Sequence, residues 1–458
     1  MGTLQPATAG PALRRVMRAR DYFTLAFGSI VGVGWLILLD DWLARGGPVG
    51  AMLGFLVGGV ALIPIIYVYG RLAARLPESA TEVAYTAAVF PRAVSFAAGW
   101  AMALGYVIVC PFEAVAMGRL AAYAFPQMNE FELYRVNDYP VCLPQLLLGL
   151  ATTAAITFIN FRGIRHSTVL QNVATFGLLA IFALFATLGL LHGNVDNLPP
   201  YFADERGAWG GLLSVLLVLQ IVPYYMTGCE TIPKCAEEAS GGFPPSRFLP
   251  VMFWALAVGT LFYVTVIGVV ALLQPWPSLL KVPYPTAAAF ERAFGWPWLV
   301  RLIFVAAVLS LVKVYNGNFL AGTRLLYAMG RRRLLGGWLG EVHARYQTPA
   351  VAILLVGVLG MAGTFLGRAA LVPITEVGSL TCALGWLAVS LAFCCGAAGP
   401  LRPGAWVLGI AGVVVSGLLV PLILWGFGIY EWLALAGWAV FGLVLWCYRP
   451  SGNVGAGQ

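Results

Sequence analysis

Long apolar runs separated by short polar segments fill almost the whole length of this chain of 458 residues. Only 10% of its residues are charged, whereas an ordinary soluble domain has about 25%, so the chain cannot cover itself with a water-facing surface. One helix needs roughly 20 apolar residues to cross a membrane. The sequence therefore predicts an all-α polytopic membrane protein with twelve transmembrane helices, at about residues 21–44, 47–70, 93–120, 142–161, 167–191, 209–232, 247–273, 297–329, 349–367, 371–398, 404–425 and 428–447.

Basic residues fall mainly in every second connection between these spans. Cytoplasmic connections of membrane proteins are rich in lysine and arginine. This bias predicts that the N-terminal tail (residues 1–20) and the C-terminal tail (residues 448–458) both lie in the cytoplasm, in a multi-pass protein of the cytoplasmic membrane. The net charge of +8 then comes from these connections, so we expect the chain to contact a lipid bilayer and no nucleic acid.

Two spans contain clusters of helix-breaking residues near their middle. Residues 28–34 read Gly-Ser-Ile-Val-Gly-Val-Gly, and residues 223–233 read Pro-Tyr-Tyr-Met-Thr-Gly-Cys-Glu-Thr-Ile-Pro. Glycine costs about 1 kcal/mol and proline about 3 kcal/mol in a helix interior, so both clusters predict an interrupted helix. Close helix packing, which small residues allow, is the alternative reading of either cluster alone.

The two interrupted spans are the first and the sixth. They occupy corresponding positions if spans 1–5 (residues 21–191) and spans 6–10 (residues 209–398) form two repeats. Because five is an odd number, such repeats are inverted across the membrane. Residues 404–447 then add two further spans. A matched pair of interrupted spans is the best sequence indication of a transporter binding site.

Three stretches carry a family resemblance. They are the glycine-rich residues 28–34, the segment from Tyr69 to Pro77 that leads through Tyr85 to Gly99 and Trp100, and the segment from Asn318 to Arg331 that is followed by His343, Thr348 and Pro349. In these stretches the chain resembles the amino acid–polyamine–organocation (APC) superfamily of permeases. The resemblance implies a leucine-transporter-type fold of five plus five inverted helices with helices 1 and 6 broken, followed by two extra C-terminal helices. It also implies a site formed by spans 1 and 6, beside spans 3 and 8.

The chain departs from the family pattern at three places. Trp35 and Leu36 stand where the family usually has an Ile-Phe pair, and Ala80 and Thr81 replace paired glycines in an inner loop. The family's motif in span 6 is only partly kept, as Thr-Gly-Cys-Glu in residues 227–230. Two of these changes lie beside the predicted site, so the resemblance identifies the family better than the substrate.

An interrupted helix exposes backbone groups that can bind a small zwitterion. The N-terminal end of the half-helix after a break carries about half a positive charge and can hold a carboxylate, while free carbonyl groups suit an ammonium group. We expect Trp35, Tyr225 and Met226 to close over the side chain of the ligand, with ordinary packing as the alternative. The predicted substrate-binding residues are Ser29, Ile30, Val31, Gly32, Val33, Gly34, Trp35, Tyr225, Met226, Thr227, Gly228 and Glu230.

Charged residues within predicted spans are costly and usually functional. Asp40 and Asp41 lie near the outer end of span 1, which favours a solvated vestibule that can attract a cationic amine. Glu230 matches the span-6 glutamate of the resembled family and can sense protonation or connect the broken helix to its neighbours. The residues that we expect to serve coupling or gating are Glu113, Lys313, Asp40 and Asp41.

Glu113 and Lys313 lie near the middle of spans 3 and 8, which are neighbours in the resembled fold. An ion pair between them lowers the cost of burying either charge, and a purely structural pair is one reading of this expected contact. In the other reading, Lys313 takes the place of a bound cation. Because burial disfavours the charged form of lysine, Lys313 then binds and releases a proton during transport. We therefore favour proton coupling or exchange over sodium symport.

No enzyme motif stands out in the sequence. His166, His192 and His343 lie in loops or at span ends, and neither an HExxH nor a GxSxG arrangement occurs. We expect no catalytic residues, no metal and no cofactor. The sequence favours a secondary active transporter (permease) that moves a small amino acid by alternating access. A transporter of a cationic amine (polyamine or amino alcohol) is the alternative, and a nutrient sensor or intramembrane enzyme on such a scaffold is the alternative from another class.

Overall fold

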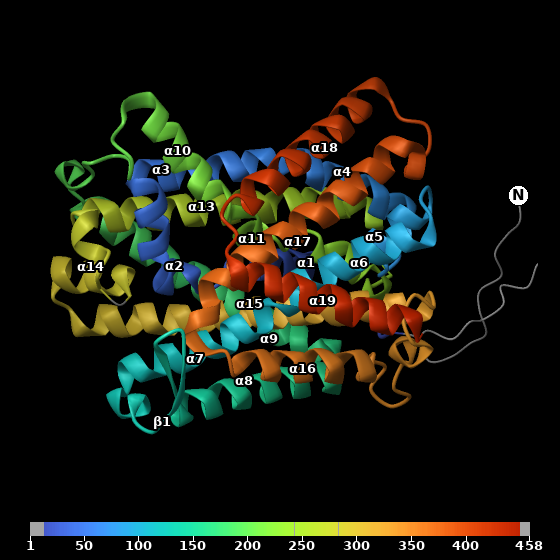
Figure 1. Ribbon diagram of the computed structural model, residues 1–458, viewed down its shortest axis with the longest axis horizontal. Helices are drawn as coiled ribbons and strands as arrows, with labels where there is room; N and C mark the ends of the chain where they lie inside the picture. Colours follow the sequence, from blue (N-terminus) through green and yellow to red (C-terminus); the bar gives the residue numbers. More distant parts are fainter. Residues whose placement is uncertain (1–12, 242, 283, 449–458) are drawn as a thin grey trace, which may run out of the picture.

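The computed structural model describes residues 13–241, 243–282 and 284–448, which fold almost entirely into α-helices (Figure 1). The connection at residues 125–142 includes an antiparallel hairpin of β1 (Glu132–Val136) and β2 (Tyr139–Cys142), which the sequence did not predict. The α-helices are α1 (Ala19–Ile30), α2 (Gly34–Ile37), α3 (Leu39–Ala61), α4 (Ile63–Arg75), α5 (Thr81–Ala87), α6 (Arg92–Val107), α7 (Val109–Ala124), α8 (Leu143–Arg162), α9 (Ile164–His192), α10 (Gly207–Leu219), α11 (Val222–Met226), α12 (Thr231–Lys234), α13 (Phe248–Leu273), α14 (Pro285–Phe294), α15 (Pro297–Arg331), α16 (Ala350–Thr364), α17 (Leu371–Ala392), α18 (Pro403–Leu424) and α19 (Ile429–Cys447).

Nine stretches of the described chain are helical, long and apolar enough to cross a membrane. Two shorter apolar helices, α10 and α16, accompany them. The first and sixth apolar runs of the sequence are divided among several short helices. The nine stretches are Leu39–Arg75, Arg92–Ala124, Leu143–Arg162, Ile164–His192, Pro245–Leu273, Pro297–Arg331, Gly367–Ala397, Pro403–Leu424 and Ile429–Cys447.

The connection expected between the first two spans is a sharp bend inside α3 and not a loop. Gly47 has a φ of +62°, which L side chains rarely adopt, and Pro48 follows it. A Cβ atom on Gly47 would lie 2.7 Å from the backbone nitrogen of Ala203. The chain therefore turns at one glycine against the segment that precedes α10.

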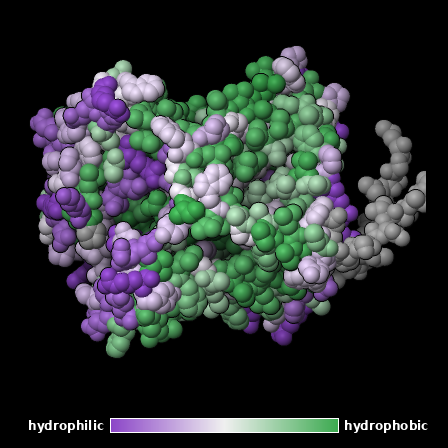
Figure 2. All heavy atoms as spheres, viewed as in Figure 1, coloured by the Kyte–Doolittle hydropathy of each residue, from purple (hydrophilic) through white to green (hydrophobic). Residues whose placement is uncertain are grey.

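Apolar residues form most of the face of the molecule seen in Figure 2, while polar residues gather mainly at its left end and in smaller groups at its right end. The long helices run between these two ends (Figure 1). Large hydrophobic side chains such as Trp254, Leu261 and Leu418 are 61%, 62% and 66% exposed. A continuous exposed apolar surface of this kind marks contact with a membrane, so the chain is a multi-pass membrane protein.

The two interrupted helices lie near the centre of the bundle, where Figure 1 shows α1 and α11 surrounded by longer helices. α1 packs against α9, α13 and α15, while α11 packs against α3 and α17. Neither break contacts lipid directly, because the side chains from Ser29 to Gly34 and from Tyr225 to Glu230 are buried. This arrangement is required when backbone groups at membrane depth lack helical partners.

Candidate functional site

The first break separates α1, which ends at Ile30, from α2, which begins at Gly34. Its carbonyl groups cannot all form helical hydrogen bonds, and side chains of neighbouring helices donate to them instead. Tyr263 of α13 donates through its hydroxyl to the carbonyl of Ile30 at 2.8 Å. Ser310 of α15 donates to the carbonyls of Val31 and Gly32, at 3.1 and 2.7 Å. The predicted interruption is therefore present. Side chains of α13 and α15 stabilise it by donating hydrogen bonds to its carbonyl groups.

The second break separates α11, which ends at Met226, from α12, which begins at Thr231. The carboxylate of Glu230 turns back into this break. It accepts hydrogen bonds from the Thr227 hydroxyl at 2.7 Å, the Gly228 amide at 3.1 Å and the Trp386 indole at 3.1 Å. Glu230 thus stabilises the unwound segment and joins it to α17, one of the two roles predicted for this residue.

The two breaks meet at Gly228. This residue has a φ of +144°, and a Cβ atom there would lie 2.8 Å from the backbone nitrogen of Ile30 and 2.9 Å from Cβ of Ser29. Both the backbone conformation and the contact require glycine. The second unwound segment, predicted from the sequence, therefore packs against the last turn of α1, directly before the first break.

Tyr225 covers the first break from the side of α11. A Cβ atom on Gly34 would lie 2.5 Å from Cε1 of the Tyr225 ring, and this ring packs at 4.8 Å, centroid to centroid, from Trp42 of α3. Met226 lies beside Thr260, whose hydroxyl is 3.9 Å from its sulfur. The predicted position of Tyr225 and Met226 next to the breaks is therefore consistent with the structure.

Trp35 packs against the neighbouring helices α9 and α13, which is the alternative expected for it. Its indole ring packs 6.0 Å from the rings of Phe185 on α9 and Phe262 on α13. Its nitrogen donates to the Ser310 hydroxyl at 3.4 Å. The Trp35 ring therefore lies between α9 and α13, because Phe185 and Phe262 form an apolar contact surface for it.

Lys313 is fully buried on α15 and reaches the first break. Its Nζ donates to the carbonyl of Val31, and to the carbonyl of Gly28 at 3.4 Å. It also lies 5.1 Å from the centroid of the Phe27 ring. The expected ion pair with Glu113 is wrong: within the described residues, no contact of 4 Å or less joins the two charges. The unwound carbonyls hold the ammonium group instead.

Glu113 of α7 faces the same break from another direction. It is 2% exposed, and its Oε2 has no hydrogen-bond partner among the described residues. Its Oε1 lies 3.1 Å from the position that a Cβ atom on Gly32 would occupy. A buried carboxyl group that lacks a donor is expensive. Glu113 therefore offers an unused acceptor beside the unwound segment.

The two acids at the start of α3, Asp40 and Asp41, differ from each other. Asp41 accepts from Arg45 at 2.9 Å, and Arg45 also binds Glu376 of α17 at 2.8 Å and Gln220 at 3.3 Å. Asp40 is partly exposed, and its Oδ1 is buried without a hydrogen-bond partner in the part of the chain that the structure describes. Sequence reasoning missed the roles of Arg45 and Glu376, although the spacing of four residues between Asp41 and Arg45 is typical of an ion pair on a helix.

Two buried ion pairs lie on the far side of the second break from α11. Lys234, the last residue of α12, binds Glu82 at 2.6 Å, and neither side chain is exposed. Arg324 of α15 binds Glu238 at 2.6 Å. None of these four residues was among the site residues predicted from the sequence. The charges of Lys234 and Glu238, close to the second break in the sequence, could have indicated such pairs. Their partners could not be identified, because Glu82 and Arg324 lie 152 and 86 positions away in the chain.

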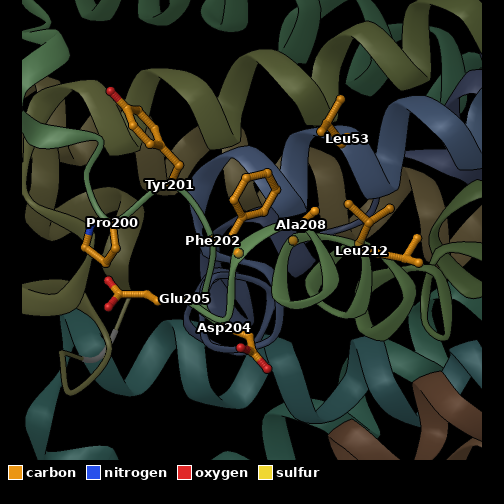
Figure 3. Close-up of a pocket in the computed structure, with 11 residues that line it drawn as sticks. Leu53, Pro200, Tyr201, Phe202, Asp204, Glu205, Ala208 and Leu212 are labelled. Atoms are coloured by element: carbon orange, nitrogen blue, oxygen red, sulfur yellow. The ribbon is translucent and has the colours of Figure 1, made fainter.

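A separate cavity of about 630 Å³ lies between α3, α10 and the segment before α10. Figure 3 shows Leu53 and Leu212 on its walls, with Asp204 and Glu205 at its edge. None of the predicted binding or coupling residues lines it. This cavity is therefore distinct from the site at the breaks.

Two interrupted helices that meet inside an apolar helical bundle define the class of this protein as a membrane transporter. Residues 20–444 match the amino acid permease family, and the chain therefore belongs to this family. The membership confirms the resemblance to the APC superfamily, and it identifies a transporter and not an enzyme.

The relatives of this chain carry the names of several substrates. The amino-acid permease RocE of Bacillus subtilis (strain 168) is 26% identical over 83% of this chain and 80% of its own length. The methylthioribose transporter of the same organism is 26% identical over 82% and 81%. The mouse cationic amino acid transporter 4 is 28% identical over 82% of this chain and 59% of its own length.

Proposed function

We propose that this protein carries a small amino acid across the cytoplasmic membrane by alternating access around the two breaks. The observation that supports this proposal most strongly is the contact of Gly228 with Ile30, which brings the second unwound segment next to the first break. The amides and carbonyls there suit the carboxylate and ammonium groups of a zwitterion. The proposal includes twelve spans in a five-plus-five inverted repeat, with both termini in the cytoplasm.

Alternating access requires closures that can open on either side of the site. The bridge from Asp41 through Arg45 to Glu376 is suited to close the outer side. The buried pairs Lys234–Glu82 and Arg324–Glu238 are suited to close the inner side. In the proposed cycle, one set of contacts separates while the other remains intact.

Lys313 is the proposed coupling group. Its ammonium group contacts two carbonyls of α1 and its break, which are the ligands that a small metal cation would use. A lysine in this position makes a bound sodium ion unnecessary and offers a group that can lose a proton. Proton-coupled uptake, or exchange without an ion, is therefore proposed in preference to sodium symport.

A cationic substrate is the second candidate. It is supported by the unpartnered carboxyl of Glu113 at Gly32, since an ammonium or guanidinium group forms a strong, charge-assisted hydrogen bond with a carboxylate. Relatives include a cationic amino acid transporter by name. A zwitterionic amino acid with a basic side chain satisfies both the breaks and Glu113.

The test is uptake by the purified full-length protein in proteoliposomes. Labelled leucine, lysine and putrescine are each offered with an inward proton gradient, an inward sodium gradient or neither. We expect uptake of at least one amino acid, which the proton gradient increases or which depends on exchange. A protein that binds these compounds without flux is a sensor, and uptake of putrescine alone contradicts an amino acid substrate.

A further inference from the structure

Polar side chains of α9, α1 and α15 form a continuous hydrogen-bonded cluster, called the seam below. Its members are Asp21, Thr24, Ser167, Gln171, Asn172, Thr175 and Asn316. Ser167, Gln171 and Thr175 follow each other at intervals of four residues on one face of α9, so all three face inward, and all are buried. Polar side chains within membrane helices are rare and mark either helix contacts or pathways for ions and protons. Where the two ends of the seam lie indicates whether it serves helix contact or proton movement.

One end of the seam is Asp21, which lies beside the exposed Arg20 at the start of α1. Asn172 donates to Asp21 at 2.7 Å and accepts from the Thr24 hydroxyl at 2.5 Å. Gln171 donates to the carbonyl of Thr24 at 3.1 Å. Hydrogen bonds therefore connect the surface at the start of α1 to the buried Gln171 in the first third of α9.

The other end of the seam reaches the turn of α15 that follows Lys313. Asn316 donates to Gln171 at 2.8 Å and accepts from Ser167 at 2.9 Å. The amide of Gln171 also packs on Gly28, where a Cβ atom would lie 1.9 Å from its Nε2. The carbonyl of this same Gly28 accepts from Lys313. The seam and the ammonium group thus meet at one residue of α1.

Few charges surround Lys313 at this point. α1 presents the ring of Phe27, α9 presents the uncharged Gln171, and α7 contributes Glu113 as the nearby carboxyl group. At the Asn316 end of the seam, Asn160 of α8 has a buried Oδ1 that finds no partner within residues 13–241, 243–282 and 284–448. This acceptor can hold a water molecule once the seam opens.

We propose that the seam is the cytoplasmic exit route for a proton released by Lys313. When α1 tilts away from α9, water enters between Asn172, Gln171 and Gly28. It takes one proton from the Lys313 ammonium group and leaves a neutral amine, and the Asp21 carboxylate attracts the resulting hydronium ion toward the cytoplasm. This inference rests on the proposed proton-coupled function.

The construction of α1 allows this movement. The helix ends at Ile30, so it is covalently continuous with α2 only through unwound backbone. Its other end is held by the Tyr22 hydroxyl, which donates to the carbonyl of Cys235 at 2.8 Å, and by pairing of Met17 with Ala239. Release of these contacts, together with those that Tyr263 and Lys313 make with Ile30 and Gly28, lets α1 move as a short rigid unit.

The experiment compares net uptake with counterflow in proteoliposomes. Net uptake requires Lys313 to release its proton in every cycle, whereas counterflow of labelled for unlabelled amino acid at equal pH does not. The variants are Asn172→Leu and Thr24→Val, which remove seam contacts while keeping side-chain volume. Thr187→Val is the matched control, because Thr187 is on the exposed face of α9 and bonds only within its own helix.

We expect net uptake driven by a proton gradient to fall about tenfold or more in both seam variants, with counterflow close to that of the wild type. Equal loss of both activities, or no loss of either, assigns the seam to helix packing and overturns the inference. Wild-type uptake that does not change with the proton gradient also overturns the inference about the seam, but it leaves the proposed amino acid transport in place. Absence of any wild-type flux contradicts the proposed function itself.

Discussion

Lys313 of α15 donates through its Nζ to the carbonyl oxygen of Val31, inside the break between α1 and α2. This contact joins a helix of 35 residues to the segment that separates two short helices. An ammonium group therefore stands where backbone carbonyls have lost their helical donors. Any change in its charge alters the contact between α15 and the first break directly.

Replacement of Lys313 by methionine tests this contact. The variant keeps much of the side-chain volume but cannot donate to the carbonyls of Val31 and Gly28, so we expect uptake driven by a proton gradient to fall about 100-fold. Lys281→Met, in an exposed loop, is the matched control and should transport like the wild type. A requirement for a sodium gradient, combined with unchanged uptake by Lys313→Ala, refutes the role of Lys313 in coupling.

Substitution of Gly228 by alanine tests the meeting of the two breaks. The φ of +144° and the 2.8 Å approach to Ile30 leave no room for a methyl group, and strained backbone of this kind costs about 1–3 kcal/mol. We expect a lower thermal unfolding temperature in detergent and a loss of substrate binding. Gly437→Ala in α19, where a Cβ atom meets nothing within 4 Å, should leave both quantities unchanged. An equal effect of the two variants contradicts the inferred contact.

The buried pair of Arg324 and Glu238 should contribute far more to stability than its exposed neighbour. Removal of one partner from a buried ion pair costs about 3–5 kcal/mol, and these side chains are 1% and 0% exposed. Arg331, 51% exposed and paired with Glu237, should contribute only about 0–1 kcal/mol. Thermal unfolding of Arg324→Ala and Arg331→Ala measures the difference. Similar shifts for both variants would show that burial does not govern these pairs.

Asp204 should not contribute to the pH dependence of transport. The hydrogen bonds from Arg206 lower the pKa of this carboxyl from 3.8 to about 2. Because its folded-state pKa is lowered, the stabilising contact persists above the unfolded value and is lost only as the pH falls toward 2. Between pH 5 and 8, Asp204→Asn should therefore give the same uptake profile as the wild type. A shifted profile would mean that Asp204 meets a different environment during the cycle.

The sequence predicted the two breaks because their causes are local: glycine and proline weaken a helix wherever they stand, as in residues 28–34 and 223–233. It could not predict where side chains point. Trp35 packs between α9 and α13, and Lys313 binds carbonyls instead of Glu113. Both outcomes depend on how whole helices rotate against one another. The Glu82–Lys234 pair, 152 positions apart, was hidden for the same reason.

Glu113 should decide between a neutral and a cationic substrate. Its Oε2 lacks a donor among the residues that the structure describes, and its Oε1 lies beside Gly32 of the first break. A positively charged ligand group therefore gains a charge-assisted hydrogen bond there. If the natural substrate is cationic, Glu113→Gln should weaken lysine binding about tenfold or more, while leucine binding changes little. Glu130→Gln, in an exposed connection, is the control for a general loss of negative charge. Calorimetric titration of the purified variants measures both affinities.

Glutamine keeps the shape of the Glu113 side chain and removes only its charge. An equal loss of affinity for lysine and leucine would therefore show that Glu113 stabilises the structure of the break. A selective loss of affinity for lysine would show that Glu113 recognises the substrate.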